Sequence, residues 1–447
     1  MALVKPPAVL LTMALAASFA GASDDSRGHN YSPPTRNDYP AEVFWGDTHL
    51  HTNLSPDAFS FGNRGVTPEQ AYRFARGEVV NASNGISAQL QRPLDFLMVS
   101  DHAEFMGIFP RIYSLSPEII DTPLGKRWGE YVKNREFRYV MTEFVLKSMD
   151  LDPSHIPNAL KTLDPRLSPE LLSEIDRLEV PPKLEHSIWT QVGEVADTFN
   201  DPGKFTAFIG YEWTSMPGGN NLHRNVLFRD DASKTSLVTP FSALDSSDPE
   251  DLWQFLARYE EETGGKVLAI PHNGNLSNGS MFAKATFTGL EFDKDYLQRR
   301  SRWEPIVEVT QIKGDGEAHP FLSPNDEFAD YGTWDTGNLS GQPKQQKMLE
   351  FEYARSALKN GLAIEQLLGS NPYAFGMIGS TDAHTSFATA DEDNFFGKMS
   401  NLEPAPGRVN KLMGTDDPNT PGAIKATDTL SSGYAAIWAR ENTREAL

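Results

Sequence analysis

Short apolar runs that end in polar clusters recur along this chain of 447 residues and constrain its fold more than any other feature. The runs are rich in Val, Ile, Leu and Phe, which is typical of strands buried on both faces. They are EVFWGDTHLH, PLDFLMVSDH, FTAFIGYEWT, NVLFRD, KVLAIPHNGN, PIVEVTQIKG, YAFGMIGSTDAH and GYAAIWA. Helical patterns such as PEDLWQFLARYEEETGG, with Gly264-Gly265 as a stop signal, separate several of them. We therefore predict an α/β fold with a parallel sheet, closed into a barrel.

A long segment, about residues 105–204, is mostly helical by pattern and follows the second apolar run. Its clearest parts are SPELLSEIDRLEV and EHSIWTQVGEVADTFN. Long ordered insertions beside an active face shape substrate access. We predict that residues 41–447 form one domain and that this segment is a helical cap insertion.

The N-terminus has the pattern of a secretory signal peptide. Lys5 supplies a positive charge, an apolar run covers residues 8–20, and Ala20-Gly21-Ala22 is a small-residue cleavage site. We predict a signal peptide over residues 1–22, a flexible leader over 23–40, and a secreted or periplasmic protein; a buried helix or an anchor is the alternative. No other run is long and apolar enough to span a bilayer, so we expect no membrane span after cleavage.

Charge and the lack of cysteine narrow the classes of function. The chain has 61 acidic and 40 basic residues, a formal net charge of −21, and such a field repels nucleic acids as a main partner. Because there is no cysteine, a metal site must use imidazole and carboxylate ligands. That ligand set favours Mn, Fe or Zn.

Histidines gather at the ends of the apolar runs. Six of the ten histidines lie at or close to such an end, namely 49, 51, 102, 223, 272 and 384. On a strand, His49 and His51 point to the same side because they are two residues apart. The carboxyl ends of strands in a barrel or open α/β sheet meet at one face. An edge hydrogen bond explains one such histidine, but the set predicts a hydrolytic centre with several metal ions.

The polar clusters also resemble a known family. DTHLHTNLSPD, VSDHAE, GYEWT, IPHN and STDAH resemble the metal motifs of the polymerase and histidinol phosphatase (PHP) superfamily. FWGDTHLHTNLSPDA, SDHAEFMG and GYAAIWARENTRE are similar to the branch called domain of unknown function 3604, over about residues 42–447. The resemblance implies a distorted seven-stranded β/α barrel with two or three divalent ions at its carboxyl-terminal rim. Members usually continue past TREAL, so we expect either a truncated chain, ending inside a helix at Leu447, or a naturally short member.

The resemblance also implies a set of metal ligands drawn from these clusters. They are His49, His51 and Asp382 for a first ion, Glu212 as a bridge, His223 and His272 for a second ion, and Asp57, His102 and His384 for a third. Asp57 stands where many members carry histidine, so occupancy of the third site stays open. For His223 a simple loop histidine is the alternative.

Candidates for the proton donor to the leaving group are a water on the third ion and the side chains of Asp101, Glu104 and His319. Asp101, like Asp47, has a second interpretation as a group that orients a neighbouring imidazole.

Contacts to an anionic substrate are expected from Arg64, Arg224 or Lys313, with a solvated surface charge as the alternative for each. Glu308 lies on an apolar run and has three equal interpretations: a metal ligand, a substrate contact or a buried hydrogen-bonded carboxylate.

Together these features predict an exported metal-dependent hydrolase, with phosphoesterase activity preferred. A hydroxide bridging two divalent ions would attack the ester, so no amino-acid nucleophile is needed. The expected substrate is a small anionic ester or a sulfated or phosphorylated saccharide. A sulfate-ester hydrolase, an amidohydrolase-type enzyme and a non-catalytic metal- or glycan-binding module are the alternatives. The sequence does not define the oligomeric state.

Overall fold

The computed structural model describes residues 40–149, 164, 166–413, 424–430 and 433–447. The chain divides into two units, Met1–Ala41 and Glu42–Leu447, and only the second is described below. The predicted signal peptide and all but the last residue of the predicted leader lie outside the described residues. Among the helices that are described, none combines the length and the apolar character needed to cross a membrane.

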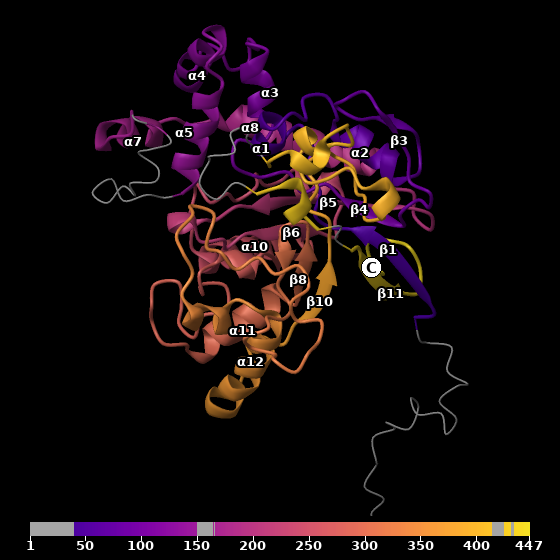
Figure 1. Cartoon of the computed structure of the whole chain (residues 1–447), viewed down its shortest axis with the longest axis vertical. Helices are drawn as coiled ribbons and strands as arrows, with labels where there is room; N and C mark the ends of the chain where they lie inside the picture. Colours follow the sequence, from indigo (N-terminus) through magenta and orange to yellow (C-terminus); the bar gives the residue numbers. More distant parts are fainter. Residues whose placement is uncertain (1–39, 150–163, 165, 414–423, 431–432) are drawn as a thin grey trace, which may run out of the picture. The chain divides into compact units, whose positions relative to one another are not determined.

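A curled six-stranded sheet forms the centre of the fold (Figure 1). Its order is β11 (Ala435–Ala439), β1 (Glu42–Asp47), β4 (Phe96–Met98), β5 (Thr206–Trp213), β6 (Arg224–Phe228) and β7 (Val267–Pro271). A second sheet has the order β10 (Gly376–Gly379), β8 (Ile306–Gln311) and β9 (Gly314–Asp315), and β2 (Val80–Asn81) pairs with β3 (Ser87–Ala88). Each predicted strand is present, and the α/β class is confirmed.

The predicted parallel sheet is only partly correct. Strands β1, β4 and β5 are parallel, but β6 is antiparallel to both β5 and β7, and β11 is antiparallel to β1. Parallel neighbours need a crossover of a dozen or more residues, usually a helix. Only a loop with the short 3₁₀ helix η3 (Pro217–Gly219) joins β5 to β6, so β6 turns straight back. The fold is therefore a mixed α/β fold.

Helices flank the sheets at the positions that their sequence patterns indicate. The α-helices outside the segment 105–204 are α1 (Pro56–Ser60), α2 (Pro68–Ala75), α9 (Ala232–Thr235), α10 (Pro249–Thr263), α11 (Lys294–Trp303) and α12 (Ala354–Leu368). Helix α10 begins after Asp248, whose side chain accepts a hydrogen bond from the backbone of Glu250. It ends at Gly264 with a φ of 64°, so the predicted glycine stop is confirmed.

Within the described residues, the remaining 3₁₀ helices are η4 (Gly274–Leu276), η5 (Gln346–Phe351), η6 (Glu392–Asn394), η7 (Ser400–Leu402), η8 (Arg408–Asn410) and η9 (Ala426–Asp428).

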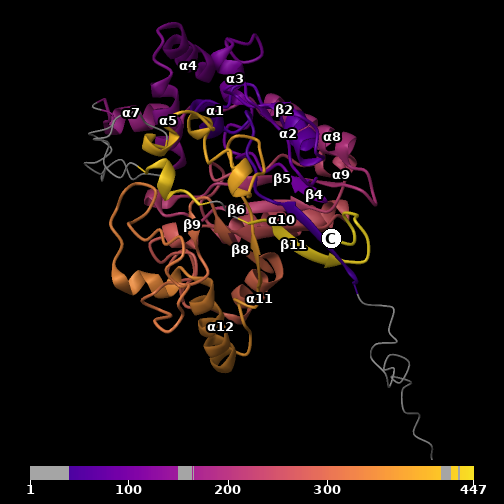
Figure 2. The ribbon, with the colours of Figure 1, turned by 45° about the vertical axis from the view of Figure 1, so that its right-hand side comes forward.

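The segment 105–204 contains α3 (Ile108–Tyr113), α4 (Pro123–Lys133), α5 (Arg138–Ser148), α7 (Pro169–Asp176) and α8 (Pro182–Phe199). Helices α3, α4, α5 and α7 form a group of their own, whereas α8 lies beside α2 and the sheet (Figures 1 and 2). Trp189 of α8 packs its ring on Tyr211 of β5 and Phe228 of β6.

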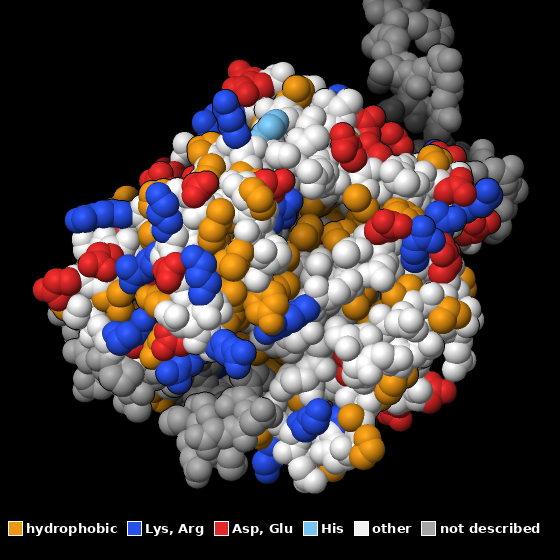
Figure 3. Space-filling view, turned by 90° about the horizontal axis from the view of Figure 1, so that it is seen from above, with side chains coloured by type: hydrophobic (Ala, Val, Ile, Leu, Met, Phe, Trp, Pro, Cys, Tyr) orange, Lys and Arg blue, Asp and Glu red, His pale blue; other side chains and the backbone are white. Residues whose placement is uncertain are grey.

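On the face seen from above, basic, acidic and hydrophobic side chains are interspersed (Figure 3).

The predicted C-terminal helix does not form. Residues 440–447 adopt bends and turns, and a side chain of this segment binds distant parts of the chain instead. The Asn442 amide donates to the backbone carbonyls of Asp95 and Lys204, and the Thr443 hydroxyl accepts from the backbone of Ala446.

A half-buried carboxyl on α8 makes stability depend on pH. Burial raises the pKa of Glu185 to about 7, and the negative charges of Asp245 and Glu104 add to the effect. Because the folded-state pKa lies above the unfolded value, stability is lost as pH rises from about 4.5 through 7.

We expect Glu185→Gln to raise the free energy of unfolding by about 1 kcal/mol at pH 8 and to leave it unchanged near pH 4.5. Urea unfolding at both pH values measures this. Glu194→Gln, at an exposed position of the same helix, is the control and should change neither value. An equal gain from Glu185→Gln at both pH values would contradict the assignment.

Candidate metal centre

The ends of β1 and β10 lie side by side and carry the first group of ligands. Leu50, after β1, bridges to Ala383, after β10. The backbone N–H of Asp382 donates to the carbonyl of His49 over 2.8 Å. The buried carboxylate of Asp47 accepts from the Thr381 hydroxyl over 2.5 Å and from the backbone N–H of His49 over 3.0 Å. Asp47 therefore fixes the two strand ends rather than facing the ligands.

The first group of ligands is tight and fully buried. His49 Nε2 and His51 Nε2 lie 3.1 Å apart, and each is 3.3 Å from Asp382 Oδ1. The three side chains have no exposed surface. One divalent ion can be held by all three, since their ligand atoms lie within 4.8 Å of one another.

Glu212 connects the first group to the second. Its Oε2 lies 3.4 Å from His49 Nε2 and 3.1 Å from His51 Nε2. Its Oε1 lies 2.6 Å from His223 Nδ1 and 3.0 Å from His272 Nε2. The two oxygens of one carboxylate thus face two sets of imidazoles, as expected of a bridging ligand.

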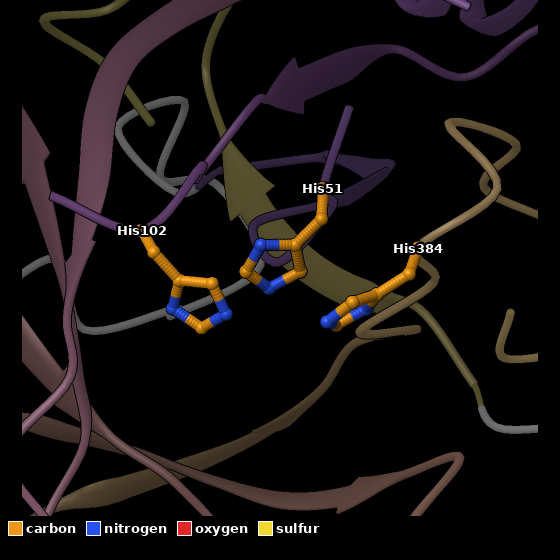
Figure 4. A group of neighbouring side chains, drawn as sticks. All are labelled: His51, His102 and His384. Carbon is orange, nitrogen blue, oxygen red and sulfur yellow. The ribbon is translucent and has the colours of Figure 1, made fainter. Parts of the chain in front are cut away.

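The third group lies around His51. The rings of His51, His102 and His384 turn toward one another from three separate segments of the chain (Figure 4). Asp57 joins them, with Oδ2 2.7 Å from His384 Nε2 and Oδ1 3.3 Å from His102 Nε2. Asp57, which stands where many members of the resembled family carry histidine, therefore lies in the third group of candidate ligands.

The unsatisfied atoms of this cluster fit a metal. Asp382 Oδ1 and Oδ2 are buried without a well-formed hydrogen bond, although Oδ1 lies 3.3 Å from both His49 Nε2 and His51 Nε2. Glu212 Oε2 has three imidazole nitrogens within 3.4 Å but makes a well-formed hydrogen bond with none of them. Buried polar atoms without partners are costly, and a shared cation satisfies carboxylate and imidazole lone pairs together.

Charge separation within the cluster is strong. Burial opposes ionisation of Glu212, but the imidazoles of His102, His272 and His223 outweigh it and hold the pKa of that carboxyl well below its usual range. Burial likewise opposes protonation of His49, but the carboxylates of Glu308 and Asp382 raise its pKa to about 10. Metal ions binding to this form of the site must displace protons.

Polar partners orient the imidazoles from behind. Glu308 Oε2 lies 2.9 Å from His49 Nδ1, the Ser55 hydroxyl 2.8 Å from His51 Nδ1, and the Thr214 hydroxyl 2.6 Å from His102 Nδ1. Glu308 is thus a buried hydrogen-bonded carboxylate that orients a ligand. Partners that hold the second ring nitrogen set which nitrogen faces a metal.

The three side chains that are candidate proton donors each make hydrogen bonds with groups other than the ligand atoms. Asp101 accepts hydrogen bonds from Thr52 and Ser55, so it fixes the loop that carries His51. Glu104 is buried and accepts from the backbone of Thr214 and Ala243.

His319 has its own surroundings. Its Nε2 lies 3.1 Å from Asp335, and its ring packs on Tyr353. Among the described residues, the contacts of His319 are thus with Asp335 and Tyr353 and not with the residues of the cluster.

Of the three candidate anion contacts, only Lys313 lies at the cluster. Its Nζ is 2.8 Å from Asp382 Oδ2, and its side chain is 14% exposed. Arg224 is buried and paired with Glu304, because alternation on β6 points it away from the side of His223. Arg64 is exposed and stacks on the ring of Tyr113.

Sequence reasoning missed Lys398. Its Nζ lies 2.5 Å from Asp382 Oδ1, and its side chain is 1% exposed. Lysine is almost never fully buried unless it is paired, so a lone lysine in the polar stretch after STDAH gave no signal.

Comparison with known families matches residues 38–447 to "Protein of unknown function (DUF3604)". The chain belongs to the DUF3604 family. The match spans every strand and every cluster residue described above, so this DUF3604 protein carries its buried histidine and carboxylate cluster within the family region. No curated protein and no solved structure matches it.

Proposed function

We propose that this protein is a metal-dependent hydrolase of ester bonds and that phosphoric esters are its preferred substrates. One observation carries the proposal: the single carboxylate of Glu212 contacts five imidazoles, and these come from four separate segments of the chain. A structural carboxylate needs far fewer partners, and imidazoles packed this closely are otherwise unfavourable. Clusters of imidazole and carboxylate around a bridging acid are suited to hydrolytic centres with several ions.

The proposal includes the PHP-type barrel. Strands β1, β4, β5, β6, β7, β8 and β10 would be its seven members, and the bridge between Leu50 and Ala383 supports closure between β10 and β1. Residues 1–22 stay a predicted signal peptide, and export stays part of the proposal.

The residues have distinct roles in this mechanism. Two ions held here would supply an activated water near neutral pH and neutralise charge on the ester oxygens. His49, His51 and Asp382 would hold one ion, His223 and His272 a second, and Glu212 would bind both. Burial of these side chains limits the access of bulk water, which strengthens every electrostatic contact in the site.

The third group and Lys313 favour a phosphoesterase over an amidohydrolase. Asp57, His102 and His384 form a ligand set that a two-metal amidohydrolase does not require. Lys313 places a partly exposed ammonium at the cluster, where it can pair with a substrate anion. A sulfate ester would use the same contacts, so phosphate and sulfate esters are both assayed.

Metal content of the purified protein tests the proposal. We expect two to three equivalents of Mn, Fe or Zn by elemental analysis, and a loss of at least one equivalent in His49→Ala. His186→Ala, at an exposed histidine on α8, is the matched control and should keep the full metal content.

The same samples are then assayed on phosphate and sulfate monoesters and diesters. Hydrolysis that is lost in His49→Ala and kept in His186→Ala supports the proposal. A protein that binds no metal after reconstitution would refute it and favour a binding module.

A further inference from the structure

Lys398 contacts two of the proposed ligands at three points. Its Nζ donates to the backbone carbonyl of Asp382 over 2.6 Å and pairs with Oδ1 of the same residue over 2.5 Å. Its own carbonyl accepts the backbone N–H of His384 over 2.8 Å. Asp382 belongs to the first group of ligands and His384 to the third, so one residue joins both groups.

Asp382 needs such support because its backbone is strained. Its φ is 52°, in the left-handed region that non-glycine residues rarely adopt. A conformation of this kind is unfavourable for a residue with a side chain and persists only where the surroundings fix it. Three contacts fix it here: the Asp382 N–H donates to His49, and the Asp382 carbonyl accepts from Lys398 and lies 3.0 Å from His384 Nδ1.

The contacts of Lys398 differ from those of the other lysine at this carboxylate. Lys313 Nζ reaches Asp382 Oδ2 with its side chain alone, and that side chain is 14% exposed. The Lys398 side chain is 1% exposed and also holds the Asp382 backbone. Lys313 is thus open to a substrate, whereas Lys398 is enclosed among the ligands.

We propose that Lys398 is a positioning residue: it holds the Asp382 backbone in its left-handed conformation and thereby sets Asp382 and His384 together for metal binding. This inference rests on the proposed function, because it concerns how the same site is built. The alternative is that Lys398 only balances the charge of Asp382.

The two explanations predict effects of opposite sign. Removing a cation that only balances charge leaves Asp382 freer to bind a metal ion, so metal affinity should rise. Removing a positioning residue lets the strained backbone relax, so metal affinity should fall, by about tenfold or more. Lys313→Met provides the matched charge control, because it removes an ammonium from the same carboxylate without touching the backbone carbonyl.

The experiment titrates metal-free full-length protein with Co²⁺ and follows both calorimetric affinity and the visible absorption bands of the bound ion. We expect Lys398→Met to bind Co²⁺ about tenfold or more weakly, with altered bands, and Lys313→Met to bind at least as tightly as the wild type. Lys398→Arg, which keeps a donor to the carbonyl, should recover part of the affinity. Thermal melts of the metal-free proteins report folding.

If Lys398→Met does not fold, Lys398→Gln serves as the test, since it loses the charge and its amide, one atom shorter, no longer reaches the Asp382 carbonyl. Weaker Co²⁺ binding by that variant supports positioning. Equal or tighter binding by Lys398→Met or Lys398→Gln overturns it while leaving the proposed function intact. A wild type that binds no Co²⁺ would instead refute the proposed function itself.

Discussion

Glu212→Gln should remove most of the bound metal and lower ester hydrolysis by about a thousandfold or more. The amide is nearly isosteric, so the change tests charge rather than packing. Glu212 contacts five imidazoles through both oxygens, and the neutral amide cannot bridge two cations. Elemental analysis and initial rates on the preferred ester measure the two effects.

Two comparisons make this prediction specific. Glu194→Gln, at an exposed position on α8, should retain wild-type metal content and rate. His384→Ala removes a ligand from the third group only, so it should cost less metal than Glu212→Gln. A Glu212→Gln protein with full metal content would show that Glu212 is not the bridging ligand.

Gly46→Ala should destabilise the fold by about 3 kcal/mol or more. Gly46 lies on β1 opposite Phe96 of β4. A Cβ atom there would meet the Phe96 carbonyl oxygen and its ring at 2.3 Å, which is closer than atoms can pack. The backbone of β4 cannot move aside alone because β5 pairs with its other edge. The midpoint of urea unfolding measures the loss.

Gly376→Ala is the matched control. Gly376 is also a strand glycine, at the start of β10, but a Cβ there meets nothing within 4 Å. We expect a change of at most about 0.5 kcal/mol. If the two variants unfold at the same urea concentration, the close approach of β1 to β4 does not require a glycine at position 46.

The features of this structure that could be predicted are those that short stretches of the sequence determine. Buried strands are apolar runs, and the residue that follows each run lands at a strand end, so His49, Glu212, His272 and Asp382 could be assigned to one region without a structure. Their convergence in the structure agrees with that argument. Helix α10 was equally predictable, from the pattern PEDLWQFLARYEEET to the stop at Gly264, although its N-cap Asp248 was not predicted.

The unpredicted part depends on contacts between distant segments. The short connection before β6 is a local signal that the strand reverses direction, but which side of it His223 and Arg224 face depends on its pairing with β5 and β7. Glu308 acts through a partner 259 residues away and Lys398 through one 16 residues away, and the same residue types elsewhere are ordinary surface or buried residues. Glu104 followed a ligand motif closely but is committed to backbone hydrogen bonds.

The pairing of β1 with β11 has a consequence for how the protein is made. One edge of the strand that leads to His49 is completed by residues near the other end of the chain, and Asp47 bonds a threonine 334 residues away. Such high contact order slows folding, since long loops must close before any pairing is gained. During synthesis the ligands leave the ribosome long before they can meet. A metal ion that needs all three groups of ligands would therefore bind only the folded protein and would not assist the early steps of folding.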